Sequence, residues 1–206
     1  MSALDFREIP QANLANGEQD EFELFARDFF VYLGYKIISE PDRGQDGGKD
    51  ILVQESRTGI GGETKVLWLV SCKHFAHSNV GKGKAVGVDD EINVLDRLSS
   101  NKCDGFIGFY STIASSGLTQ KMKGLSEDRC KEFQIFHHGN IEEILFRSLE
   151  GLQVARRYLP KSMKLWDESQ ENIGSKSICN DSESDLRMLR QRYYEEYIQR
   201  KKQEKY

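Results

Sequence analysis

The sequence lacks several features that mark well-defined classes of protein. Its four cysteines are far apart and form no CxxC pair, so nothing supports a zinc ribbon. No stretch approaches the roughly 18 consecutive apolar residues that a membrane span requires. The N-terminal segment has no basic start followed by an apolar run. We therefore expect no membrane span and no secretory signal, and we expect the chain to act in the reducing cytoplasm.

An excess of basic residues is also missing. The 206 residues include 29 Lys and Arg against 33 Asp and Glu, which gives a formal net charge of -4. Nucleic-acid-binding proteins usually carry a basic footprint, so the total charge argues weakly against such a partner. Local charge matters more, because an active site that binds a divalent metal needs carboxylates.

Apolar periodicity predicts an amphipathic helix over residues 18–33. Its apolar residues are spaced like one face of a helix: Phe22, Phe25, Ala26, Phe29, Phe30 and Leu33. Gly34 follows in the position where a left-handed residue ends a helix. Extended segments are predicted at residues 35–38, 50–54, 66–73, 105–110 and 133–137. Further helices are predicted to begin at Asp89, at Ser115 or Ser116, and at Asn140.

The predicted order of elements favours an α/β fold. Short turns join the first strands, which makes them antiparallel, whereas the later strands alternate with helices and can pair in parallel. The result is a mixed β-sheet flanked by helices with an αβββαβ core. We divide the chain into an N-terminal arm (residues 1–17), an α/β domain (18–150), and a polar linker with a charged C-terminal helix (151–206), the linker being placed at residues 160–182.

Three polar features converge around two of the predicted strands. Asp50 opens one strand after a glycine-rich loop, Lys73 closes the next, and an acidic residue, Glu21 or Glu23, lies on the preceding helix. Strand alternation puts Ser71 on the same face as Lys73. A hairpin between the strands then brings Asp50 near Lys73.

Such a set suits phosphodiester hydrolysis. A carboxylate can hold Mg²⁺, which polarises the phosphate and lowers the pKa of a bound water. A lysine can orient that water or offset charge in the transition state, and a second carboxylate completes an oxygen-rich shell. The plainer alternative is a turn hydrogen bond for Asp50 and a surface position for Lys73. A charged lysine at the end of a nearly apolar strand favours the functional reading.

The segments around these residues resemble the Mrr-type restriction endonuclease family, part of the PD-(D/E)xK nuclease superfamily. The family pattern is a helix with FE, then LGY, then GxDGGxD-I, then a strand ending in QxK or ExK. The matching segments are FE at residues 22–23, LGY at 33–35, GQDGGKDI at 44–51, VSCKH at 70–74 and DGFIGFYST at 104–112. The resemblance covers roughly residues 18–149 and implies a restriction-endonuclease-like sheet.

The resemblance also implies roles for individual residues. Asp50 is then the metal aspartate, Lys73 the catalytic lysine, and Glu23, rather than Glu21, the helix carboxylate that completes the catalytic set. The metal, Mg²⁺ with Mn²⁺ as a substitute, is expected on Asp50, Glu23 and the backbone carbonyl of Cys72.

Two further residues are expected in the outer shell of the metal. Asp46 would shape the glycine-rich loop or act as an outer acid. Ser71 stands where the family has glutamine or glutamate, and its short hydroxyl cannot reach as far. The expected metal shell therefore depends on the other ligands and on water.

The expected partner is double-stranded DNA. Lys82 and Lys84 lie in a glycine-rich loop that follows the strand of Lys73, and together with His74 they are predicted to contact DNA. A solvated flexible loop is the alternative for the two lysines. A zinc site on Cys72, His74 and His77 lacks an evident fourth ligand.

Three hypotheses of function remain open. The first is a metal-dependent DNA endonuclease that acts in defence against foreign or modified DNA, with pairing into a homodimer for double-strand cutting. The second is a DNA-binding or sensor module of the same fold with weakened catalysis. The third is a general α/β protein in which these residues only stabilise turns. Asp50 and Lys73 favour the first hypothesis, and Ser71 favours the second.

Overall fold

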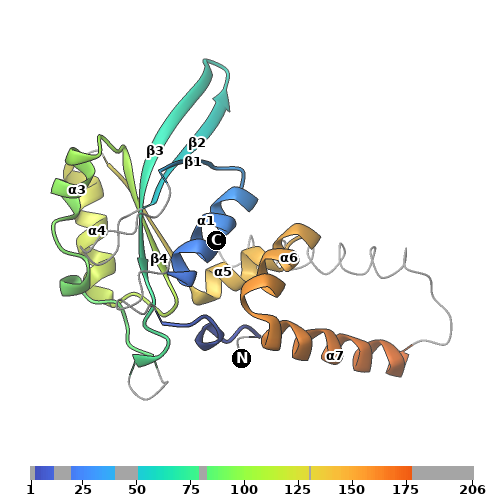
Figure 1. Ribbon diagram of the computed structural model, residues 1–206. Coiled ribbons are helices and arrows are strands. Elements are labelled where there is room, and N and C mark those ends of the chain that lie inside the picture. The colour runs from blue at the N-terminus through green and yellow to red at the C-terminus, as the bar shows by residue number, and fades with distance from the viewer. Residues whose placement is uncertain (1–2, 12–19, 40–50, 79–82, 130, 178–206) are drawn as a thin grey trace, which may run out of the picture. The chain divides into compact units, whose positions relative to one another are not determined.

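A five-stranded mixed sheet organises the first of the chain's two compact units, Met1–Ser162; the second unit is Met163–Tyr206 (Figure 1). The computed structural model describes residues 3–11, 20–39, 51–78, 83–129 and 131–177. The strands are β1 Lys36–Ser39, β2 Ile51–Gly59, β3 Gly62–Lys73, β4 Gly105–Tyr110 and β5 Glu132–His137. They lie in chain order, with β1–β2 and β2–β3 antiparallel and β3–β4 and β4–β5 parallel. The predicted α/β class, a mixed sheet flanked by helices, is confirmed.

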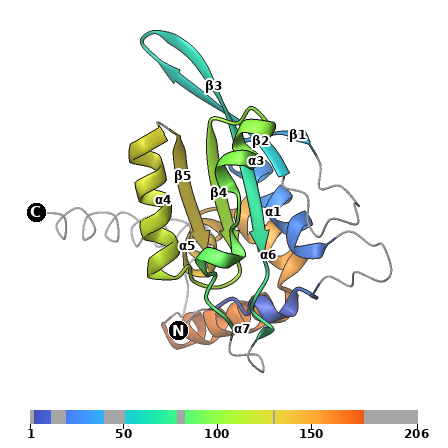
Figure 2. The same cartoon turned by 90° about the vertical axis from the view of Figure 1, so that its left-hand side faces the viewer.

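Helices cover both faces of this sheet. The α-helices are α1 Glu21–Tyr32, α3 Val94–Ser100, α4 Ser116–Arg129, α5 His138–Leu145, α6 Leu149–Tyr158 and α7 Pro160–Ser177, and two short 3₁₀ helices are η1 Phe6–Glu8 and η2 Val88–Asp90. Figures 1 and 2 show α3 and α4 against one face and α1 against the other, with α5 and α6 on the side of α1. None of the described helices has an apolar stretch long enough to cross a membrane.

Helix α1 forms where the aromatic pattern predicted a helix. The Asp20 side chain caps its start by accepting a hydrogen bond from the Phe22 N–H at 2.9 Å. Gly34 follows its end with φ +86°, the left-handed conformation that glycine adopts without strain. Four rings of this helix surround Phe109 of β4, with ring centroids 5.2 to 5.8 Å away: Phe22, Phe25, Phe29 and Phe30. This aromatic cluster buries one face of the sheet.

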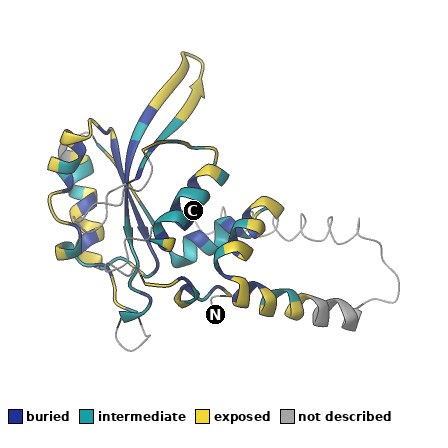
Figure 3. Ribbon diagram, in the orientation of Figure 1, coloured by how far each residue is buried: buried dark blue, intermediate teal, exposed yellow. Residues whose placement is uncertain are grey.

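A second core buries the opposite face, between the sheet and α3 and α4. Leu69, Phe106 and Tyr110 of the sheet pack there with Leu98 and Leu118 of the two helices. Figure 3 shows the central strands as buried, with the exposed residues on the outer sides of these helices. Because both faces are covered there, residues 66–72 of β3 and all of β4 read as nearly continuous apolar runs.

The segment expected to be an N-terminal arm, residues 1–17, packs into the first unit over its described part. Leu4, Phe6 and Ile9 are buried, and the Leu4 N–H donates to Glu142 of α5 at 2.8 Å. Phe6 also packs edge-on against Phe25 of α1, with ring centroids 6.0 Å apart. An apolar residue at every second or third position of this short segment is enough to bury it, although the segment is too short to show a periodic pattern.

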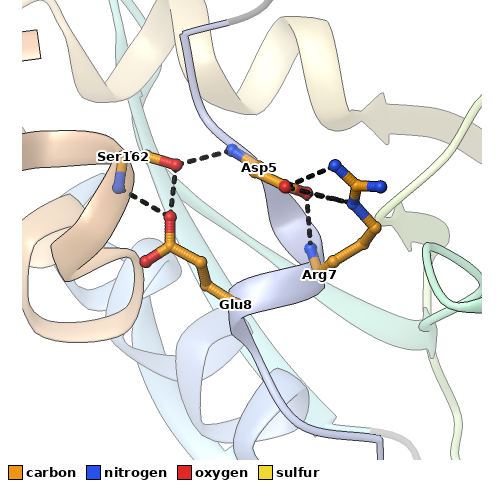
Figure 4. Close-up of polar contacts among 4 residues, drawn as sticks. All are labelled: Asp5, Arg7, Glu8 and Ser162. Carbon is orange, nitrogen blue, oxygen red and sulfur yellow. Dashed lines mark hydrogen bonds and ion pairs between the residues drawn. The ribbon is translucent and has the colours of Figure 1, made fainter. Parts of the chain in front are cut away.

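Helix α7 occupies most of the stretch expected to be a polar linker, residues 160–182. Pro160 takes the first helical position, where its fixed φ and missing N–H suit a helix start. The Glu8 carboxylate accepts from the N–H and the hydroxyl of Ser162, the N–H at 2.6 Å (Figure 4). It also accepts from the N–H of Lys161 at 2.6 Å. The Ser162 hydroxyl in turn accepts from the Asp5 N–H at 2.8 Å. This cap comes from a residue 153 positions earlier, so the local sequence around the helix does not reveal it.

We expect Glu8→Ala to destabilise the protein by about 1–2 kcal/mol, the typical cost of a lost helix cap. The variant removes the acceptor for two N–H groups and one hydroxyl. The measurement is urea denaturation followed by circular dichroism. The control is Glu127→Ala, which removes an exposed carboxylate from α4. Equal midpoints for Glu8→Ala and the control would show that the cap does not stabilise the fold.

Candidate active site

The end of β3 places Ser71 and Lys73 on the face covered by α3 and α4. Ser71 pairs with Gly108 and Lys73 with Tyr110 in the parallel ladder to β4. Partners in such a ladder point to the same face, and Tyr110 belongs to the core under α3 and α4. Cys72 pairs with Phe109, so its side chain lies on the face of α1.

The backbone carbonyl of Cys72 points toward the β2 side of β3. The carbonyls of Leu67 and Lys73 accept hydrogen bonds from Asp104 at 2.8 Å and from Ser111 at 3.1 Å, residues that flank β4. Carbonyls alternate in direction along a strand, so that of Cys72 is directed away from β4. On that side, Ile51 is the first residue of β2 and pairs with Val70.

Three of the predicted site residues, Asp46, Asp50 and Lys82, lie outside the described residues. Asp50 directly precedes Ile51 in the sequence. The predicted proximity of Asp50 to Lys73, and the role of Asp46 in the outer shell, stay predictions.

A carboxylate that the sequence did not single out lies against Ser71. Glu91 is fully buried, with an exposed fraction of 0%. Its Oε2 accepts from the Ser71 hydroxyl at 3.1 Å and from the Arg97 guanidinium at 3.0 Å, and its Oε1 accepts from the Tyr110 hydroxyl at 3.0 Å. Burial, reinforced by the charge of Glu91, raises the pKa of Tyr110 far above its ordinary value, so Tyr110 remains a donor.

The sequence pattern missed Glu91 because it predicted a regular helix from Asp89. In the structure η2 ends at Asp90 and α3 begins only at Val94, after Asn93 in a left-handed conformation with φ 51°. This irregular turn leaves Ile92 62% exposed and directs Glu91 inward. The local signal was only a run of acidic residues, which is more often solvated.

Lys73 and Lys84 both act on Asp90, the residue before Glu91. The Asp90 carboxylate accepts from Lys84 Nζ at 2.8 and 3.1 Å and from the Gly87 N–H at 2.7 Å. Burial acts to raise the pKa of Asp90, but these hydrogen bonds and the charges of Lys84 and Lys73 hold it below its usual value. Lys84 Nζ also lies 4.9 Å from the centre of the Phe75 ring. Lys84, a predicted DNA contact, is half exposed and forms an ion pair with Asp90.

His74, also predicted to contact DNA, lies in the packing between α1 and the N-terminal segment. Its ring stacks on Phe22, with centroids 4.7 Å apart, and its Nε2 lies 2.8 Å from the carbonyl oxygen of Ile9. His77 Nε2 lies 2.8 Å from the same oxygen. His74 Nδ1 is buried without a hydrogen-bond partner among the described residues. Burial lowers the pKa of His74, so its ring is neutral at pH 7.

The Nε2 atoms of His74 and His77 both face the carbonyl oxygen of Ile9. This arrangement does not favour the zinc site considered on Cys72, His74 and His77. Across the described ranges, no group of three or more His, Cys, Asp or Glu side chains is placed to hold a metal ion.

Glu23 comes from the face of the sheet opposite to Ser71 and Lys73. It lies on α1, whose rings pack on Phe109. The start of α1 reaches the end of β3, because Phe22 stacks on His74. The sheet thus separates Glu23 from Ser71 and Lys73. Because Asp50 lies outside the described residues, the predicted shared role of Glu23 and Asp50 stays a prediction.

Comparison with known proteins supports the resemblance found in the sequence. Residues 14–103 match the restriction endonuclease family whose model describes the Mrr catalytic domain, which confirms that resemblance. The matched range contains α1, the strands β1 to β3, Ser71, Lys73 and Glu91. No curated protein matches the chain.

Two solved structures are similar to this chain. The DNA modification-dependent restriction endonuclease AspBHI has a TM-score of 0.41 and 13% identity over 79% of this chain and 43% of its own. The MspJI restriction endonuclease, in complex with a 27-mer oligonucleotide, has a TM-score of 0.37 and 14% identity over 66% of this chain and 27% of its own. The chain thus spans less than half the length of either protein.

We expect the protein to lose stability as the pH falls from about 7.5 to about 5.5, and His74→Asn to lose less. The folded pKa of His74 lies below its ordinary value of 6.5. The unfolded chain therefore takes up a proton first as the pH falls, and stability that is present above 6.5 is lost below it. Burial also lowers the pKa of His137, so the variant should keep part of the pH dependence of stability. Urea denaturation across this range is the measurement, and identical slopes for both proteins would contradict a neutral His74.

Proposed function

We propose, from the restriction endonuclease family that residues 14–103 match, that this chain is a metal-dependent DNA endonuclease that hydrolyses phosphodiester bonds. The observation that carries the proposal is the position of Lys73. It ends a strand whose second half is largely buried, inside the matched range, with Asp90 near enough to feel its charge. A lysine in this setting is typical of a functional site rather than of a solvated surface.

The proposed ligands near the end of β3 have the chemistry that a hard divalent cation prefers. The Cys72 carbonyl oxygen points toward β2, and Asp50 directly precedes β2 in the sequence. Carbonyl and carboxylate oxygens are the ligands that Mg²⁺ prefers, and Mn²⁺ accepts the same set. Asp50, Glu23 and the Cys72 carbonyl would hold the ion, provided that Asp50 continues the register of β2 and that Glu23 reaches past the end of β3. A bound Mg²⁺ polarises the phosphate and lowers the pKa of a water.

Lys73 has a fixed position from which to act. Its carbonyl accepts from the Ser111 N–H at 3.1 Å, which holds the last residue of β3 in the sheet. Its ammonium can then donate to the attacking water or to a non-bridging phosphate oxygen, and it offsets the negative charge that builds up in the transition state. Fixing the backbone of Lys73 limits the region that its ammonium can reach, which helps to position it beside the phosphate.

Binding of double-stranded DNA would bring phosphates to the loop after β3. Lys84 lies in this loop with Lys82 close in sequence, and a phosphate would replace Asp90 as the partner of Lys84. Defence against foreign or modified DNA, a cytoplasmic location and pairing into a homodimer are further parts of the proposal, taken from the sequence and the family.

A second candidate function is DNA binding with weakened cleavage. The observation that favours it is Ser71, which provides no carboxylate of its own and hydrogen-bonds to a buried one. Cleavage assays with Mg²⁺ and Mn²⁺ beside a DNA-binding assay separate the two functions. Binding without cleavage under either metal would replace the enzyme by the binding module.

We expect Asp50→Ala and Lys73→Ala each to lower the rate of plasmid cleavage by about 10²–10³-fold, the usual cost of removing one group that stabilises charge in a transition state. EDTA should abolish cleavage. Lys123→Ala, an exposed lysine of α4, is the matched control and should cut like the wild type. Circular dichroism checks the fold of each variant. Cleavage that persists in folded Asp50→Ala would show that the active site has been assigned wrongly.

We expect the double variant Lys82→Ala/Lys84→Ala to bind DNA more weakly and with a flatter dependence on salt. Each lost phosphate contact lowers the slope of log K against log salt by about 0.9, so the slope should fall by roughly one to two units. The control Lys121→Ala/Lys123→Ala removes the same charge from the exposed side of α4. If the slope of the test variant matches that of the control, the loop does not touch the DNA backbone.

A further inference from the structure

We propose that Glu91 supplies the carboxylate that the family pattern carries at residue 71, so that this acid of the active site comes from a different segment of the chain. The inference rests on the proposed function and adds a residue to it. Glu91 lies in the turn before α3, twenty residues after Ser71.

The geometry at Ser71 is the first observation behind this inference. A glutamate at position 71 would carry its carboxylate oxygens two covalent bonds beyond the place where the Ser71 Oγ now lies. In the structure the Ser71 Oγ is instead one hydrogen bond, 3.1 Å, from Glu91 Oε2. The serine and the glutamate together thus reach the region that one longer side chain would fill.

The face of the sheet is the second observation. Ser71 and Lys73 share the face under α3, and Glu91 meets Ser71 on that face. Asp90, next to Glu91, feels the charge of Lys73. Glu23, the acid expected from the sequence, lies on α1, which covers the other face of the sheet. Glu91 is therefore a carboxylate that the described part of the fold brings to the face of Ser71 and Lys73, next to Asp90.

The chemistry of the carboxylate is the third observation. Burying a carboxylate costs desolvation free energy, and a buried ion pair often adds little to the stability of the fold. Glu91 is kept there by donors from three elements: Ser71 of β3, Tyr110 of β4 and Arg97 of α3. A carboxylate has about four acceptor positions, and these donors use three. One acceptor position of the carboxylate is left for a further partner.

The first test measures metal binding apart from cleavage. Isothermal titration calorimetry with Mn²⁺ and with Mg²⁺ compares the wild type, Glu91→Gln and Asp89→Asn. Asp89 is exposed in the adjacent η2, so its variant makes the same change of charge without touching the network. Glu91→Gln should lose about 10–100-fold in metal affinity, in the range found for groups that support a metal shell, and its cleavage should fall in parallel. Asp89→Asn should behave like the wild type.

The second test moves the carboxylate back along the chain. Glu91→Ala removes it, and Ser71→Glu in the same chain returns it from β3 into the space that the truncation opens. The double variant should recover most of the metal affinity that Glu91→Ala loses. Ser71→Ala, which leaves the Glu91 carboxylate in place, should lose less affinity than Glu91→Gln.

Several results would overturn the inference while leaving the nuclease intact. One is a folded Glu91→Gln that binds metal and cuts DNA like Asp89→Asn. Another is a loss of stability in Glu91→Gln with unchanged metal affinity, which would make the network purely structural. If Glu91→Gln does not fold, the double variant decides, and its failure to recover affinity while folded also refutes the inference. A wild type that neither binds metal nor cuts DNA would instead refute the proposed function, and the inference with it.

Discussion

The parallel pairing of β3 with β4 is the constraint on which both cores and the candidate site depend. Phe109 and Tyr110 are neighbours on β4 and point to opposite faces, one into the aromatic cluster of α1 and the other toward Glu91. The register then directs Cys72 and Lys73 to opposite faces as well. A slip of one residue would exchange the two faces, so the packing of Phe109 keeps Lys73 in place. The same burial that stabilises the sheet thus sets the geometry of the site.

Gly108 shows how tightly this register is tied to Glu91. It pairs with Ser71, and a Cβ at this position would lie 2.3 Å from the Tyr110 ring and hydroxyl oxygen. The ring of Tyr110 therefore lies over the backbone of Gly108, which brings its hydroxyl to the carboxylate of Glu91. Glycine is required here for close approach and not for a special φ. Ser71, Gly108 and Tyr110 together shape the pocket of donors that makes a buried carboxylate tolerable.

The sequence predicted the parts of the fold that depend on local pattern. The aromatic stripe identified α1, Gly34 marked its end, and the apolar run at 105–110 matched β4. Features that depend on distant partners were missed, since no local pattern reports them. The cap of α7 comes from Glu8, and Glu91 turns inward only because donors from β3, β4 and α3 meet it. At the site, Ser71 and Lys73 share a face as strand alternation requires, whereas Asp50 lies outside the described residues and its role remains a prediction.

The pairing of Glu91 with Arg97 has a consequence for the proposed metal site. A carboxylate that already shares its charge with a guanidinium at 3.0 Å offers less electrostatic attraction to a second cation than an unpaired carboxylate does. A site that uses Glu91 should therefore bind divalent ions more weakly than one with a free glutamate on β3. Mg²⁺ loses most under this condition, because Mn²⁺ binds a given set of oxygen and nitrogen ligands at least as tightly and accepts less ideal geometry. Arg97 stabilises the buried Glu91 carboxylate and thus also shifts the expected metal preference toward Mn²⁺. With Glu91 held in this way, a site can keep Lys73 and yet carry a serine at position 71.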